Sequence, residues 1–263
     1  MTVENLIVTT GAKMESANVL LAEDMARRLS ACYVERGRDS LTSLRRKYHV
    51  AYILIVRHGE LFLAMPEREF FFHPSMAHVR VKNLRQGRPD HFVEAVGLRA
   101  GMSVLDCTLG LGADAIVASY VTGAEGNVRA LESRPLIAEI VSFGLSHPRE
   151  RGPMGEAMRR IRVITADYGD FLYRQPDKSA DVVYFDPMFR QPLWDSVGLR
   201  PLRSLADGRP LEKEVLQEAC RVARQRVVMK ESHNSGEFAR LGFSLFAGGK
   251  YSRIRYGIME VSS

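Results

Sequence analysis

The chain has 263 residues, of which 46% are hydrophobic and 26% charged, and its formal net charge at neutral pH is +6. This length accommodates one α/β domain with a small additional lobe, and the hydrophobic content is ordinary for a soluble globular protein. No apolar run approaches the roughly 20 residues of a membrane span, and the N-terminus lacks a secretory leader, so we expect a cytoplasmic protein without a membrane anchor.

Residues 1–95 are predicted to form a small N-terminal α+β lobe, outside the Rossmann-like core. Residues 6–8 predict a short strand, and apolar residues at helical spacing predict a helix over 14–29. Two further apolar runs, 50–56 and 61–65, are separated by a short turn and predict a β-hairpin.

A run of basic residues without an intervening acid lies near the end of this lobe. The cations are Arg80, Lys82, Arg85 and Arg88. Three phenylalanines, 70–72, lie just upstream, and cations beside aromatic rings suit phosphate contacts with base stacking. The positive net charge permits such a polyanionic partner, so the lobe is a candidate RNA contact. A core aromatic cluster beside an ordinary basic loop explains the pattern equally well. His73 and His78 are spaced too loosely to predict a metal site.

From residue 96 to residue 263, strands and helices alternate, which predicts a parallel, doubly wound α/β sheet. The predicted strands are 102–107, 127–132, 161–165, 180–186, 226–230, 243–247 and 252–261. The predicted helices are 113–122, 135–145 and 211–222. The segments 147–160 and 190–208 are predicted to be loops, the first with at most a helical turn. The second contains Trp194 and several arginines, and a long loop beside an active site commonly contacts substrate.

A glycine turn follows the first strand of this domain. The strand ends in Asp106, and Gly110 and Gly112 precede the next helix, so backbone can approach a ligand and the helix begins with free N–H groups. Glu132 ends the next strand, 20 residues after Gly112, the spacing at which an acid reaches ribose hydroxyls in nucleotide-binding folds. A solvated strand end is the alternative for Glu132, but beside a glycine turn the pattern favours a nucleotide site.

A second motif follows a later strand. The apolar run 183–185 ends in Asp186 and Pro187, and Phe189 comes two residues on. Pro187 ends the strand and biases Asp186 towards an extended conformation. A carboxylate accepts the N–H groups of an exocyclic amine and an aromatic ring stacks a flat base, so the motif suits chemistry on a nucleobase amine. A strand end followed by an ordinary turn is the alternative.

The glycine turn also fits a dinucleotide-binding oxidoreductase. However, Ala115 replaces the third glycine of that fingerprint, and the turn lies about a hundred residues into the chain. An oxidoreductase also has no evident use for the Asp186 motif. A nucleoside site combined with a base-amine site indicates S-adenosylmethionine (SAM) and methyl transfer instead.

These residues resemble a known class of enzymes. Residues 106–112, Asp-x-Thr-x-Gly-x-Gly, resemble motif I of class I SAM-dependent methyltransferases, with Thr108 where a glycine often stands. Glu132 resembles their motif II acid, and residues 186–189 resemble motif IV of the amine-methylating members. The resemblance implies SAM as the cofactor and a Rossmann-like fold: a mostly parallel seven-stranded sheet with its last strand antiparallel. It also implies that residues 96–263 form the SAM-binding domain.

A closer resemblance is to the bacterial small-subunit ribosomal RNA guanine-N2 methyltransferase family, whose motif IV is likewise Asp-Pro-Met-Phe. Its Gly-Leu-Gly-Arg-Asp turn resembles residues 110–114, with Ala113 in place of the arginine, and Ser133 replaces a second arginine. Its Met-Ala-His-Arg stretch resembles residues 76–80. The resemblance covers roughly residues 70–260 and implies methyl transfer to guanine N2 in small-subunit ribosomal RNA.

The resemblance also implies which residues form the site. The implied catalytic residues are Asp186, Pro187 and Phe189. The implied cofactor-binding residues are Asp106, Thr108, Gly110, Gly112, Ala113, Asp114, Glu132, Ser133, Asp167 and Tyr168. In this class of enzymes the positions of Asp167 and Tyr168 contact adenine, and helix capping is the alternative for Asp167.

Other functions stay open at this point. A methyltransferase of a small molecule or protein would use Glu132 and the glycine turn but leave the basic run unused. A noncatalytic RNA-binding module with a residual nucleotide pocket is a further alternative, although the intact Asp186 argues against decay. The three cysteines, Cys32, Cys107 and Cys220, have no metal-ligand spacing and fit a reducing cytosol.

Overall fold

The computed structural model describes residues 5–13, 15–66, 68–187, 209–249 and 252–261. The chain divides into two compact units, one comprising Met1–His73 with Pro135–Gly144 and the other Pro74–Arg134 with Leu145–Ser263. The two helices that follow residue 73, α3 (Ser75–Arg85) and α4 (His91–Val96), belong to the second unit. Both contact α5 (Ala113–Thr122), and α4 also contacts β10 (Ala223–Ser232).

The first unit contains a five-stranded sheet in the order β2-β1-β3-β4-β5. Its strands are β1 (Leu6–Thr10), β2 (Cys32–Tyr33), β3 (Tyr52–Arg57), β4 (Glu60–Ala64) and β5 (Glu69–Phe71). Strand β1 pairs in parallel with β2 and β3, whereas β3, β4 and β5 form an antiparallel meander. The predicted strand at residues 6–8 and the predicted hairpin are confirmed, and strands β2 and β5 are additions.

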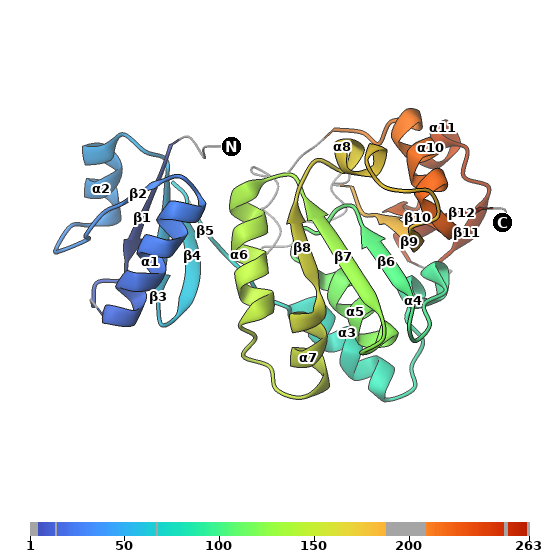
Figure 1. Ribbon diagram of the computed structural model, residues 1–263, viewed down its shortest axis with the longest axis horizontal. Coiled ribbons are helices and arrows are strands. Elements are labelled where there is room, and N and C mark those ends of the chain that lie inside the picture. Colours follow the sequence, from blue (N-terminus) through green and yellow to red (C-terminus); the bar gives the residue numbers. More distant parts are fainter. Residues whose placement is uncertain (1–4, 14, 67, 188–208, 250–251, 262–263) are drawn as a thin grey trace. The chain divides into compact units, whose positions relative to one another are not determined.

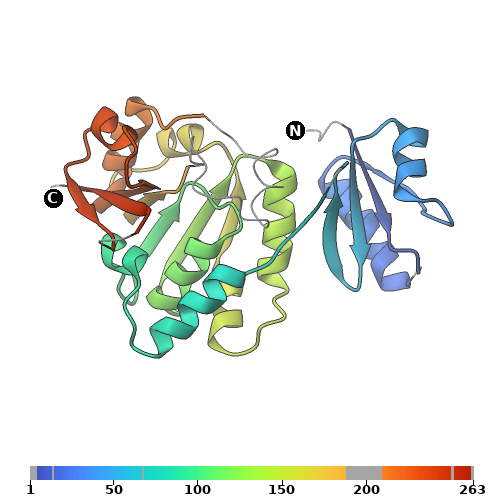
Figure 2. The same cartoon turned by 180° about the vertical axis from the view of Figure 1, so that it is seen from behind.

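Helices α1 (Ser16–Arg28) and α2 (Leu41–Tyr48) contact this sheet, and Figures 1 and 2 show α1 lying along one face of it. Strand β3 is buried on both faces. Ile53 and Ile55 pack with Leu44 of α2, and the alternate residues Leu54 and Val56 point to the face that α1 covers.

The second unit contains a seven-stranded sheet in the order β11-β12-β10-β9-β6-β7-β8. Its strands are β6 (Ser103–Asp106), β7 (Asn127–Glu132), β8 (Arg162–Thr165), β9 (Ala180–Phe185), β10 (Ala223–Ser232), β11 (Leu245–Ala247) and β12 (Ile254–Glu260). Strands β8, β7, β6, β9 and β10 run in parallel, and β12 is antiparallel to both of its neighbours. The predicted fold, a mostly parallel seven-stranded sheet with an antiparallel last strand, is therefore confirmed.

Helices cover the sheet of the second unit. They are α3 (Ser75–Arg85), α4 (His91–Val96), α5 (Ala113–Thr122), α7 (Pro153–Arg160), α8 (Tyr168–Tyr173), α10 (Lys213–Val222) and α11 (Glu237–Leu241), and α6 (Pro135–Ser146) spans the division between the units. Helix α5 contacts β6, β7 and its neighbours α3, α4 and α7, and Figure 2 shows α3 and α5 in front of the sheet. No helix among the described residues is both long enough and apolar enough to cross a membrane.

Alternation along β9 explains how one strand serves both faces of the sheet. Val183 and Phe185 pack into a core cluster with residues of α8 and α10. Tyr184 points to the opposite face, where its ring makes an edge contact with Phe92 of α4 at 4.8 Å between centroids. The same alternation continues past the end of the strand, so the side chain of Asp186 lies on the same face of the sheet as that of Tyr184.

Two helices form where the sequence predicted otherwise. Helix α7 occupies most of the predicted loop 147–160, because Pro153 starts it and Met154, Ala157 and Met158 are buried at helical spacing. Arg80, Lys82 and Arg85 of the basic run also lie in a helix, α3, and Arg88 follows it. The predicted loop 190–208 lies outside the described residues.

Candidate active site

The carboxyl ends of β7, β6 and β9 meet at one edge of the second sheet. Asp106 of β6 pairs with Ala130 of β7 and with Tyr184 of β9, so Glu132 and Asp186 each lie two residues beyond those partners. The chain also reverses its direction of winding between β6 and β9, and such a switch point is where open α/β sheets bind their ligands. The three acids singled out in the sequence therefore lie along one edge.

The glycine turn connects β6 to α5 and is shaped by two left-handed residues. Gly110 has φ 51° and Gly112 has φ 75°, a region that side chains with a Cβ rarely occupy. Leu109 N–H donates to the carbonyl of Leu131 at 2.8 Å, which fastens the turn to β7. The turn therefore presents backbone, and α5 begins at Ala113 directly behind it, with the free N–H groups of its first turn.

Glu132 lies beside this turn. Its side chain is 9% exposed and accepts a hydrogen bond from the backbone N–H of Arg134 at 2.9 Å. Burial raises the pKa of Glu132, and backbone hydrogen bonds from Arg134 and Gly110 counteract part of that effect. A half-satisfied carboxylate next to a glycine turn has the chemistry needed to accept hydrogen bonds from ribose hydroxyls.

Thr108 connects the glycine turn to the strand end at Asp186. Its hydroxyl accepts a hydrogen bond from the backbone N–H of Asp186 at 2.6 Å, and its own N–H donates to Asp106 Oδ1 at 2.9 Å. Asp106 is buried, which raises its pKa to about 8. A glycine at position 108 would lack the hydroxyl, so threonine here supplies a link that the usual motif does not contain.

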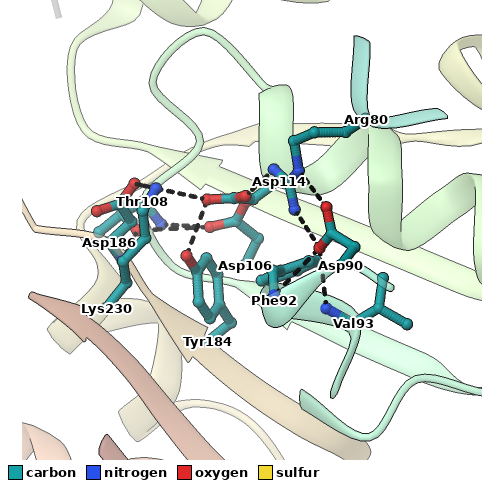
Figure 3. A network of polar contacts seen from close by, with 10 residues as sticks. All are labelled: Arg80, Asp90, Phe92, Val93, Asp106, Thr108, Asp114, Tyr184, Asp186 and Lys230. Atoms are coloured by element: carbon teal, nitrogen blue, oxygen red, sulfur yellow. Dashed lines mark hydrogen bonds and ion pairs between the residues drawn. The ribbon is translucent and has the colours of Figure 1, made fainter. Parts of the chain in front are cut away.

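Asp114, in the first turn of α5, is the centre of a buried polar network (Figure 3). Its Oδ1 accepts a hydrogen bond from Arg80, and its Oδ2 accepts from the Tyr184 hydroxyl at 2.8 Å and from Lys230 Nζ at 3.1 Å. Both carboxylate oxygens are thus engaged within the protein. The predicted contact of Asp114 with the cofactor stays a prediction.

Arg80 contacts Asp114 on the side of the network away from Asp186. Its guanidinium pairs with Asp90 through Nε at 2.7 Å and Nη2 at 2.9 Å, and Asp90 also caps α4 by accepting from the N–H groups of Phe92 and Val93. Arg80 is therefore not part of the exposed basic run in which the sequence placed it. Among its predicted partners, Phe70 is buried and Phe71 is exposed.

Lys230, near the end of β10, is the site residue that the sequence reasoning missed. Its Nζ donates to Asp186 Oδ2 at 2.6 Å as well as to Asp114 (Figure 3). Met229 pairs with Phe185 in the sheet, which places Lys230 next to Asp186 on the same face. A lysine ending the apolar run 227–229 was the available signal, because a charge at that position needs a partner at the sheet edge.

The network holds its members in fixed charge states. Burial opposes the charge on Lys230, but Asp114 and Asp186 outweigh it and raise the pKa of Lys230, which stays cationic. Burial also acts against ionisation of Asp114, yet Lys230 and Arg80 lower its pKa below the usual range. For Asp186, burial raises the pKa and Lys230 counteracts only part of the rise. Of these two carboxyls, Asp186 is therefore the more easily protonated.

Asp167 and Tyr168 lie farther along this edge of the sheet, just after β8. Asp167 caps α8 by accepting from the N–H groups of Gly169 and Asp170, and it forms an ion pair with Arg209. Tyr168 makes an edge contact with Phe185 at 5.8 Å. Capping thus accounts for Asp167, and the adenine contacts of these residues stay predictions, as do contacts of Ala113 and Ser133. Pro187 follows Asp186 at the strand end, and Phe189 lies outside the described residues.

The residues present fit SAM. The two left-handed glycines leave room for backbone to approach a ligand, the first turn of α5 offers free N–H groups, and Glu132 supplies an acceptor for ribose hydroxyls. When bound, SAM supplies a methyl group made electrophilic by its sulfonium sulfur.

Comparison with known proteins agrees with this assignment. A family model described as "Putative SAM-dependent methyltransferase" matches residues 43–254. The chain is 35% identical over 258 residues to the uncharacterized protein YpiP of Bacillus subtilis, covering 97% of this chain and all of that protein. It is 32% identical over 197 residues to ribosomal RNA small subunit methyltransferase J of Pseudomonas paraeruginosa, covering 72% of each chain.

A solved structure shares the fold. The SAM-dependent methyltransferase NGO1261 of Neisseria gonorrhoeae superimposes with a TM-score of 0.67 at 17% identity, covering 97% of this chain and 96% of that one. The matching sequence family, the shared fold and the glycine turn beside Glu132 lead to one conclusion: the chain belongs to the family of SAM-dependent methyltransferases, with SAM as its cofactor.

Proposed function

We propose that this methyltransferase transfers a methyl group to the exocyclic amine of a nucleobase, namely guanine N2 of small-subunit ribosomal RNA in the cytoplasm. One observation carries the proposal. Asp186 directly follows β9 at the edge that holds the glycine turn, precedes Pro187, and has a partly exposed carboxylate held in place by Lys230. A fixed carboxylate next to a methyl donor suits a nucleophile that must be oriented rather than deprotonated first.

The chemistry follows from the weakness of the nucleophile. The lone pair of guanine N2 is delocalised into the ring, so the amine must be oriented and its N–H groups must be engaged. The Asp186 carboxylate and the Pro187 carbonyl accept these two N–H groups, which favours a pyramidal nitrogen whose lone pair faces the methyl carbon. Such positioning is worth about 7–11 kcal/mol in favourable cases. Asp186 also stabilises the positive charge that grows on nitrogen.

The other predicted site residues have supporting roles in this proposal. Glu132 binds the ribose hydroxyls of SAM, the turn at 110–112 lies against its methionine portion, and Asp167 and Tyr168 border its adenine. Phe189 stacks on the extruded guanine. No strong general base is needed, because the methylated amine carries a positive charge and loses its proton readily.

An RNA substrate is supported by the exposed face of α3 and by the named relatives. Lys82 and Arg85 of α3 and Arg88 just after it are exposed, and no acid lies between residues 70 and 89. Met76 and Val79 on α3 are 62% and 53% exposed, so the surface combines cations with apolar contact area. Several relatives that are 30–32% identical to this chain are named ribosomal RNA small subunit methyltransferase J.

The proposal is tested by mass spectrometry of nucleosides from the ribosomal RNA of cells with and without the gene. We expect loss of N2-methylguanosine from small-subunit RNA in the deleted strain and its return when the gene is restored. The purified protein should then methylate that RNA, and the activity should fall steeply with salt because phosphate contacts release counterions. An unchanged nucleoside profile, or a salt-insensitive activity on a small molecule or protein, would refute it.

A further inference from the structure

Solvent exposure rises along the chain of contacts that leads to Asp186. The side chain of Asp114 is 9% exposed, that of Lys230 17%, and that of Asp186 27%. Asp114, which Arg80 also contacts, is therefore the most buried of these three side chains, and Asp186, the carboxylate proposed to meet the substrate, is the most open. Lys230 is the contact between these two ends.

Asp186 is held at two points. Its backbone N–H donates to the Thr108 hydroxyl at 2.6 Å, and its Oδ2 accepts from Lys230 Nζ at 2.6 Å. Within the described part of the chain, its Oδ1 accepts no hydrogen bond. The carboxylate is thus fixed in direction, with one oxygen engaged and the other available.

Lys230 is itself held by a second carboxylate, that of Asp114. Its ammonium lies between carboxylates from different elements, Asp114 of α5 and Asp186 after β9, and Tyr184 donates to the same oxygen of Asp114. This arrangement keeps Lys230 protonated, so it does not act as a base. Its remaining effect on Asp186 is to supply a positive charge and one strong hydrogen bond.

We propose that Lys230 is the positioning residue for the amine acceptor: it holds Asp186 through Oδ2, keeps the carboxylate ionised, and leaves Oδ1 to accept an N–H of the substrate amine. This inference rests on the proposed function, because it assigns Lys230 a part in the same site. The physical basis is that an ionised carboxylate accepts an N–H of the amine. A protonated carboxyl can instead place an O–H donor against that N–H donor, and the hydrogen bond is then lost.

Several charged or titratable groups surround Asp186. They are Asp106 of β6, Asp114 of α5, Arg80 of α3, Tyr184 of β9, Lys230 and Glu231 of β10, and Tyr256 of β12. Asp114 favours the protonated form of Asp186, whereas Lys230 and Arg80 favour the ionised form. Replacing Lys230 by a neutral residue therefore removes the cation that contacts Asp186 and leaves the repulsion from Asp114 in place.

The first test is a titration of Asp186 that needs no substrate. In protein labelled with ¹³C at the aspartate carboxyl carbons, Asp186→Asn identifies the Asp186 signal. Lys230→Gln should raise the pKa of Asp186 by about one to three pH units, the effect of removing an opposite charge at this range. Lys230→Arg keeps the positive charge, so the pKa of Asp186 in that variant should stay close to its value in the unmodified protein.

Asp114→Asn is the matched control with the opposite sign. It removes a negative charge close to the same carboxylate and should lower the pKa of Asp186. An unchanged Asp186 titration in a folded Lys230→Gln protein that still binds SAM would overturn the inference. If Lys230→Gln fails to fold, Asp114→Asn decides instead: an Asp186 titration left unchanged by that substitution contradicts the coupling.

The second test is the pH profile of methylation. In Lys230→Gln the acid limb of kcat should move to higher pH by the same amount as the Asp186 titration. An Asp186→Asn protein should have no such limb, and adding Lys230→Gln to it should change the profile no further. A further change in that double variant would show that Lys230 acts on something other than Asp186. Absence of RNA methylation by the unmodified protein would refute the proposed function, while the titration would still decide the role of Lys230.

Discussion

Replacing Glu132 by glutamine tests the cofactor site most directly. The carboxylate lies at the end of β7 beside the glycine turn, 9% exposed, and its Oε1 already accepts one backbone N–H, from Arg134. Glutamine keeps the shape and an acceptor for that N–H but loses the charge. A hydrogen bond to a charged group contributes about 1.5–3 kcal/mol, so the dissociation constant for SAM should rise by roughly 10- to 150-fold.

Isothermal titration calorimetry of SAM binding measures this change. Glu156→Gln is the matched control, since Glu156 is exposed on α7, and its dissociation constant should match that of the unmodified protein. The pH dependence adds a second check. Because burial raises the pKa of Glu132, SAM affinity in the unmodified protein should fall as the pH drops through that raised value, and the glutamine variant should lack this fall. An affinity unchanged by Glu132→Gln would show that the carboxylate does not bind the ribose.

Three further changes have defined outcomes. Asp186→Ala should lower turnover on the ribosomal RNA substrate by about two to three orders of magnitude, by analogy with removal of one preorganised group, and near-normal turnover would rule out its role. Arg80→Met should lower the free energy of unfolding by about 3–5 kcal/mol, because Asp90 and Asp114 lose their shared partner; denaturant titration checks this, and the exposed Arg85→Met should cost less than about 0.5 kcal/mol. Replacing Lys82, Arg85 and Arg88 together by alanine should weaken RNA binding and reduce its salt dependence, with SAM affinity unaltered; an unaltered salt dependence would show that α3 does not contact RNA.

Local motifs account for the part of the site that was predictable from sequence. The glycine turn, Glu132 and Asp186 each follow a strand, and parallel strands bring their carboxyl ends to one edge. The residue type and the strand end together fix where such a side chain lies. The fold class was also accessible, because alternating strands and helices indicate a parallel, doubly wound sheet.

Contacts between distant elements account for the part that was missed. Lys230 meets Asp114 across 116 residues, and no local pattern records that pairing. The direction of Arg80 depended on helix register. It lies three residues after Ala77 and one before Val81, both buried, so α3 turns it inward while Lys82 and Arg85 point outward. The sequence alone did not give the register of this helix, so it could not tell which of the four cations is turned inward.

The hydroxyl of Thr108 has a consequence for how the two substrates are handled. Thr108 belongs to the loop proposed to bind the methyl donor, and its hydroxyl accepts a hydrogen bond from the backbone N–H of Asp186, the residue proposed to face the acceptor. Any rearrangement of that loop when the donor arrives or departs is passed on to Asp186 through this bond. We therefore expect binding of the methyl donor to affect how Asp186 aligns the acceptor amine, through the side chain of Thr108.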